Sequence, residues 1–77
     1  MEEEKYNLIQ VIGMLKTHPN MEFSRVNDGK FIIYKGSYND LMFRIESKSE
    51  EFRQKGILKI FNYLQDLWII SKYEGDK

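Results

Sequence analysis

The side chains that could perform acid–base or nucleophilic chemistry are few in this sequence. It contains one histidine, His18, and no cysteine. A serine–histidine–aspartate set drawn from Ser24, His18 and Asp28 has no supporting motif around it. His18 also stands directly before Pro19, a position typical of a solvated helix end rather than of a general base. The sequence therefore predicts a protein that is not an enzyme.

Metal and cofactor sites are not expected either. Without cysteine or a second histidine the zinc-binding spacings cannot form, and no aspartate-rich calcium loop is present. Gly29 and Gly36 are isolated glycines and do not make a phosphate-binding loop. Asp28 and Asp40 fall in turn-forming stretches, where aspartate commonly bonds to nearby backbone. We expect no metal and no cofactor.

Composition limits the class of protein. The chain of 77 residues has room for a single domain spanning residues 1–77, and its 12 basic and 12 acidic residues cancel. No net field attracts nucleic acid or an anionic membrane, so neither partner is expected. The N-terminus is acidic where a secretory signal would be basic, and polar residues interrupt the longest apolar region, Ile57 to Ile70. These features and the lack of cysteine predict a soluble, cytoplasmic protein.

The C-terminal third, Ser47 to Tyr73, has the spacing of one long amphipathic helix. Ser47 and Glu50 fit a capping box at its start. From Phe52 onward, apolar residues recur every three or four positions and form a stripe about half the cylinder wide. Gly56 falls within this stripe. We expect this helix to organise the fold.

The preceding residues predict a short helix and three strands. Helical spacing runs from Glu3 to Thr17 and ends before Pro19. Strand-like segments follow at Met21 to Val26, Lys30 to Lys35 and Leu41 to Ile45, with Asn27-Asp28-Gly29 as a hairpin turn between the first two. The fold class is therefore α+β: a short N-terminal helix, a three-stranded antiparallel meander and the long C-terminal helix packed on the sheet (α-β-β-β-α).

The predicted sheet has two unequal faces. Strict alternation places one apolar set on the face that should receive the long helix: Phe23, Phe31, Ile33, Leu41, Phe43 and Ile45. The opposite face carries a more mixed set: Ser24, Val26, Ile32, Tyr34, Met42 and Arg44. The pattern leaves open which of the two faces the N-terminal helix covers.

Surplus apolar surface is the main indication of function. Leu58 and Ile69 lie on the polar side of the predicted long helix, flanked by Asn62 and Gln65. On the second sheet face, Tyr34, Met42 and Arg44 are residue types enriched at interfaces. These seven residues form the predicted partner-binding set. A larger protein or a second copy of the chain could cover it.

The resulting hypothesis is a small non-enzymatic binding protein that acts as an inhibitor or adaptor of a larger protein. Its size and composition suit a product of a phage or mobile element. The alternative is a dimer that holds a small molecule or nucleotide between its subunits with Tyr34, Lys35, Tyr38 and Arg44. Nucleic-acid binding ranks third, because the chain lacks a ribonucleoprotein motif and a positive net charge.

Overall fold

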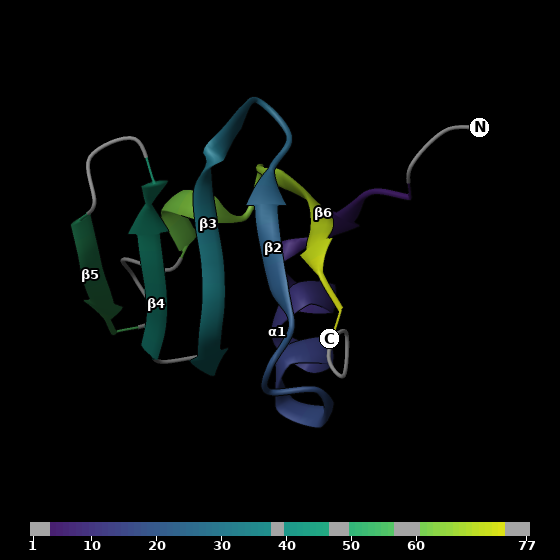
Figure 1. Cartoon of the computed structure of the whole chain (residues 1–77). Helices are drawn as coiled ribbons and strands as arrows, with labels where there is room; N and C mark the ends of the chain where they lie inside the picture. The colour runs from purple at the N-terminus through teal and green to yellow at the C-terminus, as the bar shows by residue number, and fades with distance from the viewer. Residues whose placement is uncertain (1–3, 38–39, 47–49, 57–60, 74–77) are drawn as a thin grey trace.

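The computed structural model describes residues 4–37, 40–46, 50–56 and 61–73, and Figure 1 shows their arrangement. The elements in chain order are β1 (Tyr6–Asn7), α1 (Leu8–Thr17), β2 (Glu22–Arg25), β3 (Asp28–Ser37), β4 (Asp40–Ile45), β5 (Glu50–Lys55), the 3-10 helix η2 (Phe61–Tyr63) and β6 (Leu67–Lys72). Among the described residues the strands form a six-stranded sheet in the order β1-β6-β2-β3-β4-β5, and all its pairings are antiparallel.

The three predicted strands lie side by side as β2, β3 and β4, but they are part of a six-stranded sheet rather than a three-stranded meander. The turn between β2 and β3 consists of Val26 and Asn27, so Asp28 and Gly29 of the predicted Asn27-Asp28-Gly29 turn instead begin β3. A hydrogen bond of 3.2 Å from the Lys30 amide to Asp28 Oδ1 fits the local backbone role expected of that aspartate. Glycine is required at Gly36, because a Cβ there would collide with Cδ2 of buried Leu41 on β4.

α1 ends at Thr17, as predicted, but begins at Leu8 rather than Glu3. Tyr6 and Asn7 instead pair with β6, and the Asn7 side chain then caps the helix. The cap is reciprocal: Asn7 Oδ1 accepts from the Gln10 amide, and Gln10 Oε1 accepts from the Asn7 amide, both at 2.9 Å.

Within the described ranges, no helix has the length and apolar character needed to cross a bilayer.

The prediction of a long C-terminal helix over Ser47 to Tyr73 is wrong, and so is the α-β-β-β-α fold class. The described part of that stretch forms β5, η2 and β6, so the chain is mostly strand with one short helix near its start. Gly56 directly follows β5 with φ at +93°, a left-handed conformation that no α-helix interior adopts. The expected capping box rests partly on residues 47–49, which lie outside the described ranges.

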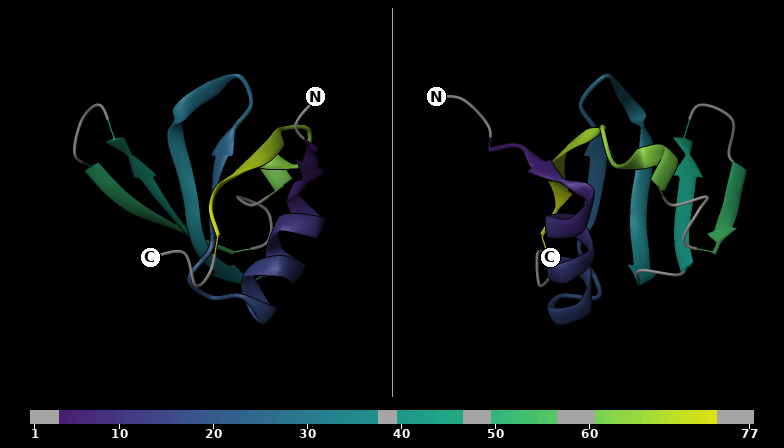
Figure 2. Two further views of the ribbon diagram at one scale, coloured as in Figure 1. Left: turned by 45° about the vertical axis from the view of Figure 1, so that its right-hand side comes forward. Right: turned by 180° about the vertical axis from the view of Figure 1, so that it is seen from behind.

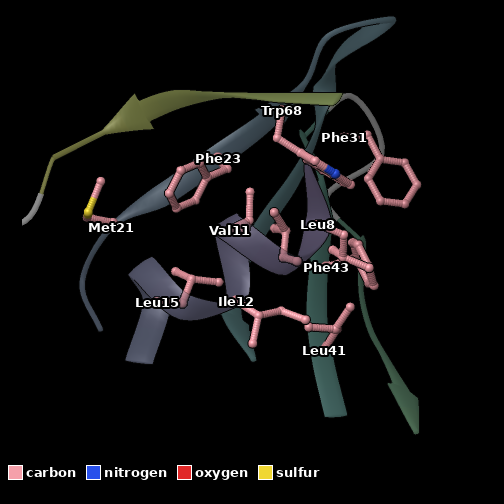
Figure 3. Packing of buried hydrophobic residues seen from close by; sticks show 11 residues of the cluster. Leu8, Val11, Ile12, Leu15, Met21, Phe23, Phe31, Leu41, Phe43 and Trp68 are labelled. Carbon is pink, nitrogen blue, oxygen red and sulfur yellow. The ribbon is translucent and has the colours of Figure 1, made fainter. Parts of the chain in front are cut away.

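Among the described residues, α1 and η2 lie on one side of the sheet (Figure 2), and no helix lies on the other side, where Ser24 and Ile32 are nevertheless buried. The alternation predicted for the first sheet face is confirmed: Phe23, Phe31, Ile33, Leu41 and Phe43 are buried in the core, and Ile45 packs against it. The core is completed by residues from α1, from the position before β2 and from β6: Leu8, Val11, Ile12, Leu15, Met21 and Trp68 (Figure 3). The short N-terminal helix thus covers the face that the sequence assigned to the long one.

Candidate functional site

The uncovered side of the sheet carries a continuous row of side chains from β6 to β5. The strand registers pair Ile69 with Ser24, Ser24 with Ile32, Ile32 with Arg44, and Arg44 with Glu51. Because side chains directly opposite in register share a face, all five belong to the side away from α1. The row is apolar towards β6 and charged towards β5. We call this side the open face.

Arg44 is the electrostatic centre of the open face. Its guanidinium binds both carboxylate oxygens of Glu22, at 2.6 and 3.4 Å, and reaches Glu46 Oε1 at 3.1 Å. The hydrogen bond to Glu22 is the main reason that the pKa of Arg44 is raised. Only 29% of the Arg44 side chain is exposed, against 55% for Glu46. Two carboxylates therefore hold the guanidinium in one orientation.

Tyr34 is held beside Arg44. Its hydroxyl donates a hydrogen bond of 2.5 Å to Glu51 Oε2, and the Arg44 guanidinium lies 5.5 Å from the centre of its ring. A β-bulge between Ile33 and Lys35 places Tyr34 as the extra residue on β3. The bond to Glu51 is the largest cause of a raised pKa for the Tyr34 hydroxyl, and partial burial adds to it.

This contact predicts a measurable titration. The folded state holds the Tyr34 proton more tightly than the unfolded chain, whose tyrosines titrate near 10.0. The contribution of Tyr34 to stability should therefore be complete below that pH and be lost as pH rises through the higher folded pKa. Absorbance titration of the phenolates should give a Tyr34 component above 10.0, and Glu51→Gln should lower it.

The Tyr34→Phe variant identifies that component, since it removes one phenol and keeps the ring. A Tyr34 component that titrates at or below the ordinary tyrosine pKa in the wild-type protein would contradict the hydrogen bond to Glu51.

A second arginine, Arg53 on β5, lies on the open face. Arg53 Nε lies 3.2 Å from Met42 Sδ and 3.3 Å from Asp40 Oδ1. Half of the Arg53 side chain is exposed. Lys35, which pairs with Met42 in register, is exposed on the same side. Together these residues form a polar border around Tyr34 and Met42.

The structure brings together part of the predicted partner-binding set. Tyr34, Met42 and Arg44 share the open face, and half-buried Ile69 joins them from β6 instead of from a helix. Leu58 lies outside the described residues. Asn62 and Gln65 are exposed in and after η2, whose Tyr63 packs against the core on the other side of the sheet. The long helix on which Ile69 was grouped with Asn62 and Gln65 does not form in the described residues.

The alternative ligand-binding set is also only partly assembled. Tyr34, Lys35 and Arg44 lie on the open face, whereas Tyr38 falls outside the described residues. Tyr34 and Arg44 already contact carboxylates of the chain itself. An anionic ligand would have to displace those carboxylates to reach them.

The carboxylates that fix the open face were not predicted from the sequence. Glu51 was assigned to the first turn of a helix, and Glu22 received no role. Glu50–Lys55 alternate in burial, with only Phe52 and Gln54 half-buried, but Phe52 is the one apolar residue of β5, so no alternation in the sequence itself indicates that Glu51 and Phe52 lie on different faces of the sheet.

The arginine charges of the open face are largely paired. Each of its arginines is paired with carboxylates, and these pairs leave little positive potential for a phosphate backbone. In residues 4–37, 40–46, 50–56 and 61–73, no group of three or more histidine, aspartate or glutamate side chains is placed to hold a metal ion. What the surface offers is an aromatic ring, a thioether and two oriented guanidinium groups.

Comparison of the chain with protein-family models, with curated proteins and with solved structures gave no match.

Proposed function

We propose that this chain is a small non-enzymatic binding protein that docks on a larger protein through the open face of its sheet, as an inhibitor or adaptor. The observation that carries this proposal is that α1 packs on one side only, leaving Tyr34, Met42 and Arg44 together on the other. Tyrosine, methionine and arginine are enriched in protein interfaces, and tyrosine and arginine supply much of the binding energy there.

The fixed orientation of these side chains supports the proposal. Arg44 is held by Glu22 and Glu46, and Tyr34 by Glu51. A side chain that is already ordered loses little conformational entropy when a partner covers it. The mixed charge of the surface favours a protein partner, which can offer both signs, over a nucleic acid, which offers one.

The test is affinity capture with two matched variants. Tyr34→Ala/Met42→Ala removes the aromatic ring and the thioether from the open face and leaves Ile69 in place. Ile9→Ala/Phe61→Ala removes exposed apolar surface from α1 and η2, on the other side of the sheet. We expect the wild-type protein and the second variant to retain the same partner, and the first to lose at least about tenfold in affinity. Thermal unfolding confirms that both variants are folded.

A partner that both variants retain equally would remove the open face from consideration. Size-exclusion chromatography with light scattering adds an independent result. A wild-type dimer that becomes monomeric only in Tyr34→Ala/Met42→Ala would identify the partner as a second copy of the chain rather than a larger protein.

A further inference from the structure

The outer edge of β6 is paired along only half of its length. β1 pairs with Leu67 and Trp68, whereas Ile69 to Lys72 have β2 on one side and, among the described residues, no strand on the other. Glu4 and Lys5 precede β1 and do not pair with β6. β1 therefore covers the outer edge of β6 for only two residues.

The backbone direction shows which groups face that edge. The Val26 amide donates to the Leu67 carbonyl at 2.8 Å, so the Leu67 carbonyl points towards the β2 side. Backbone groups of successive strand residues alternate between the two sides, and Ile69 therefore also faces β2, opposite Ser24. The amide and carbonyl of Ile70 then point to the outer edge, and the regular part of this edge ends there because the register of β6 with β2 shifts directly after Ile70. Such an edge is a template for another strand.

A cleft lies beside this edge. It has a volume of about 430 Å³ and is open to solvent. It is lined by residues from β1, α1, β6 and the segments that follow α1 and β6: Tyr6, Met14, Thr17, His18, Met21, Ile70 and Tyr73. Met21 is buried, whereas Tyr6, Met14 and Ile70 are half-buried. Two methionines give the wall of the cleft an apolar and adaptable surface. The pKa of the Tyr6 hydroxyl in the same wall is raised, mainly by burial.

We propose that the outer edge of β6 and this cleft together bind an extended peptide segment of another protein by strand addition, with one apolar or aromatic side chain of the peptide in the cleft. An extended polypeptide presents amides and carbonyls at the spacing of a strand, which matches the edge. Its alternate side chains project out of the plane of the sheet, on the side of the cleft. A small molecule of similar size would fill the cleft and leave the edge unpaired.

A second copy of this chain does not suit the edge. The other margin of the sheet is β5, where Glu50, Glu51, Arg53 and Lys55 are exposed. Charged edge strands oppose pairing between sheets, and β5 would offer the cleft only Phe52 as an apolar side chain. Phe52 is already packed against the core. β5 of a second copy is thereby excluded, and the proposal commits to a peptide from a different protein; dimerisation of the chain through β6 itself would contradict it. This site is separate from the open face and does not depend on the proposed function.

The experiment is selection of random linear peptides displayed on phage against the full-length chain, followed by binding measurements with the selected peptides made synthetically. We expect the peptides to share one apolar or aromatic anchor within a segment of high strand propensity. Methylation of backbone amides that face β6 should weaken binding at least about tenfold, whereas methylation of the alternate amides should not.

Variants of the chain locate the site. Met14→Lys and the exposed Tyr73→Ala change the cleft and should each weaken peptide binding at least about tenfold, whereas Met42→Lys on the open face should leave it unchanged. Two results would overturn the proposal: no peptide is selected, or binding of the selected peptides is insensitive to backbone methylation. Loss of binding in Met42→Lys alone would overturn it as well and assign the peptides to the open face.

Discussion

Replacement of Trp68 by alanine is expected to lower the free energy of unfolding by about 3–5 kcal/mol, enough to leave a domain of this size barely folded or unfolded. Trp68 is the only tryptophan, and none of its surface is exposed. Its ring lies 6.2 Å from those of both Phe31 and Phe43, so its removal opens a cavity beneath β3 and β4. Urea unfolding followed by far-ultraviolet circular dichroism measures the loss without relying on tryptophan fluorescence.

The matched control for Trp68→Ala is Phe61→Ala. A continuous C-terminal helix would place the two residues on one face, two turns apart, and both would be buried. In the structure Phe61 lies in η2 with 49% of its surface exposed. We expect Phe61→Ala to cost less than about 1 kcal/mol. Equal losses in the two variants would favour the helix and contradict β6.

A conservative change at Trp68 separates packing from hydrogen bonding. Trp68 Nε1 is buried and finds no acceptor among the described residues. A buried donor without a partner costs about 1–3 kcal/mol, and Trp68→Phe removes that donor while it keeps an aromatic ring. We therefore expect Trp68→Phe to be much less destabilising than Trp68→Ala. A loss as large as that of the alanine variant would show that the indole group bonds to a group outside the described residues.

The fold was predicted correctly where the spacing of apolar residues along the sequence matches their burial in the structure. The helical spacing of Leu8, Val11, Ile12 and Leu15 matches their burial on α1, and Pro19 correctly predicts the helix end. The start of α1 could not be found in the same way. Tyr6 and Asn7 are strand because they pair with β6, which lies about sixty residues further along the chain, and no local pattern encodes that pairing.

The prediction of a helix for the C-terminal third was wrong although its apolar residues have helical spacing. The helical stripe predicts that Phe61, Leu64 and Trp68 are buried together, whereas only Trp68 of the three is buried. The adjacent β-branched pair Ile69-Ile70 favoured a strand. Gly56 was counted as a neutral member of the stripe, although glycine weakens a helix interior.

The residues of the open face were predicted only on those strands that were themselves predicted. Period-two alternation on β3 and β4 was enough to place Tyr34, Met42 and Arg44 on one face. Glu22 on β2 holds Arg44, and Glu51 on β5 holds Tyr34. β5 had been assigned to a helix. The β6 edge and its cleft depend on the same long-range pairing of β6 with β1 and β2, so no stretch of sequence reveals them.

Replacement of Phe43 by alanine should cost about 3–5 kcal/mol, because this buried ring joins β4 to three neighbouring elements. It stacks on Phe52 of β5 at 5.3 Å and 20°, and its centre lies 5.1 Å from that of Phe31 and 4.7 Å from that of Tyr63. Phe52 is only half-buried on an edge strand, so Phe52→Ala should cost clearly less. Urea unfolding measures both losses.

The double variant then tests where β5 lies. If β5 pairs with β4 as the structure shows, Phe43→Ala and Phe52→Ala remove one shared contact, and together they should cost about 0.5–1.5 kcal/mol less than the sum of the single losses. Phe43→Ala combined with Ile9→Ala is the control, since Ile9 is exposed on α1 and its loss should simply add. Additive losses for Phe43 and Phe52 would mean that the two rings do not stack, and they would remove the basis for placing Glu51 beside Tyr34 on the open face.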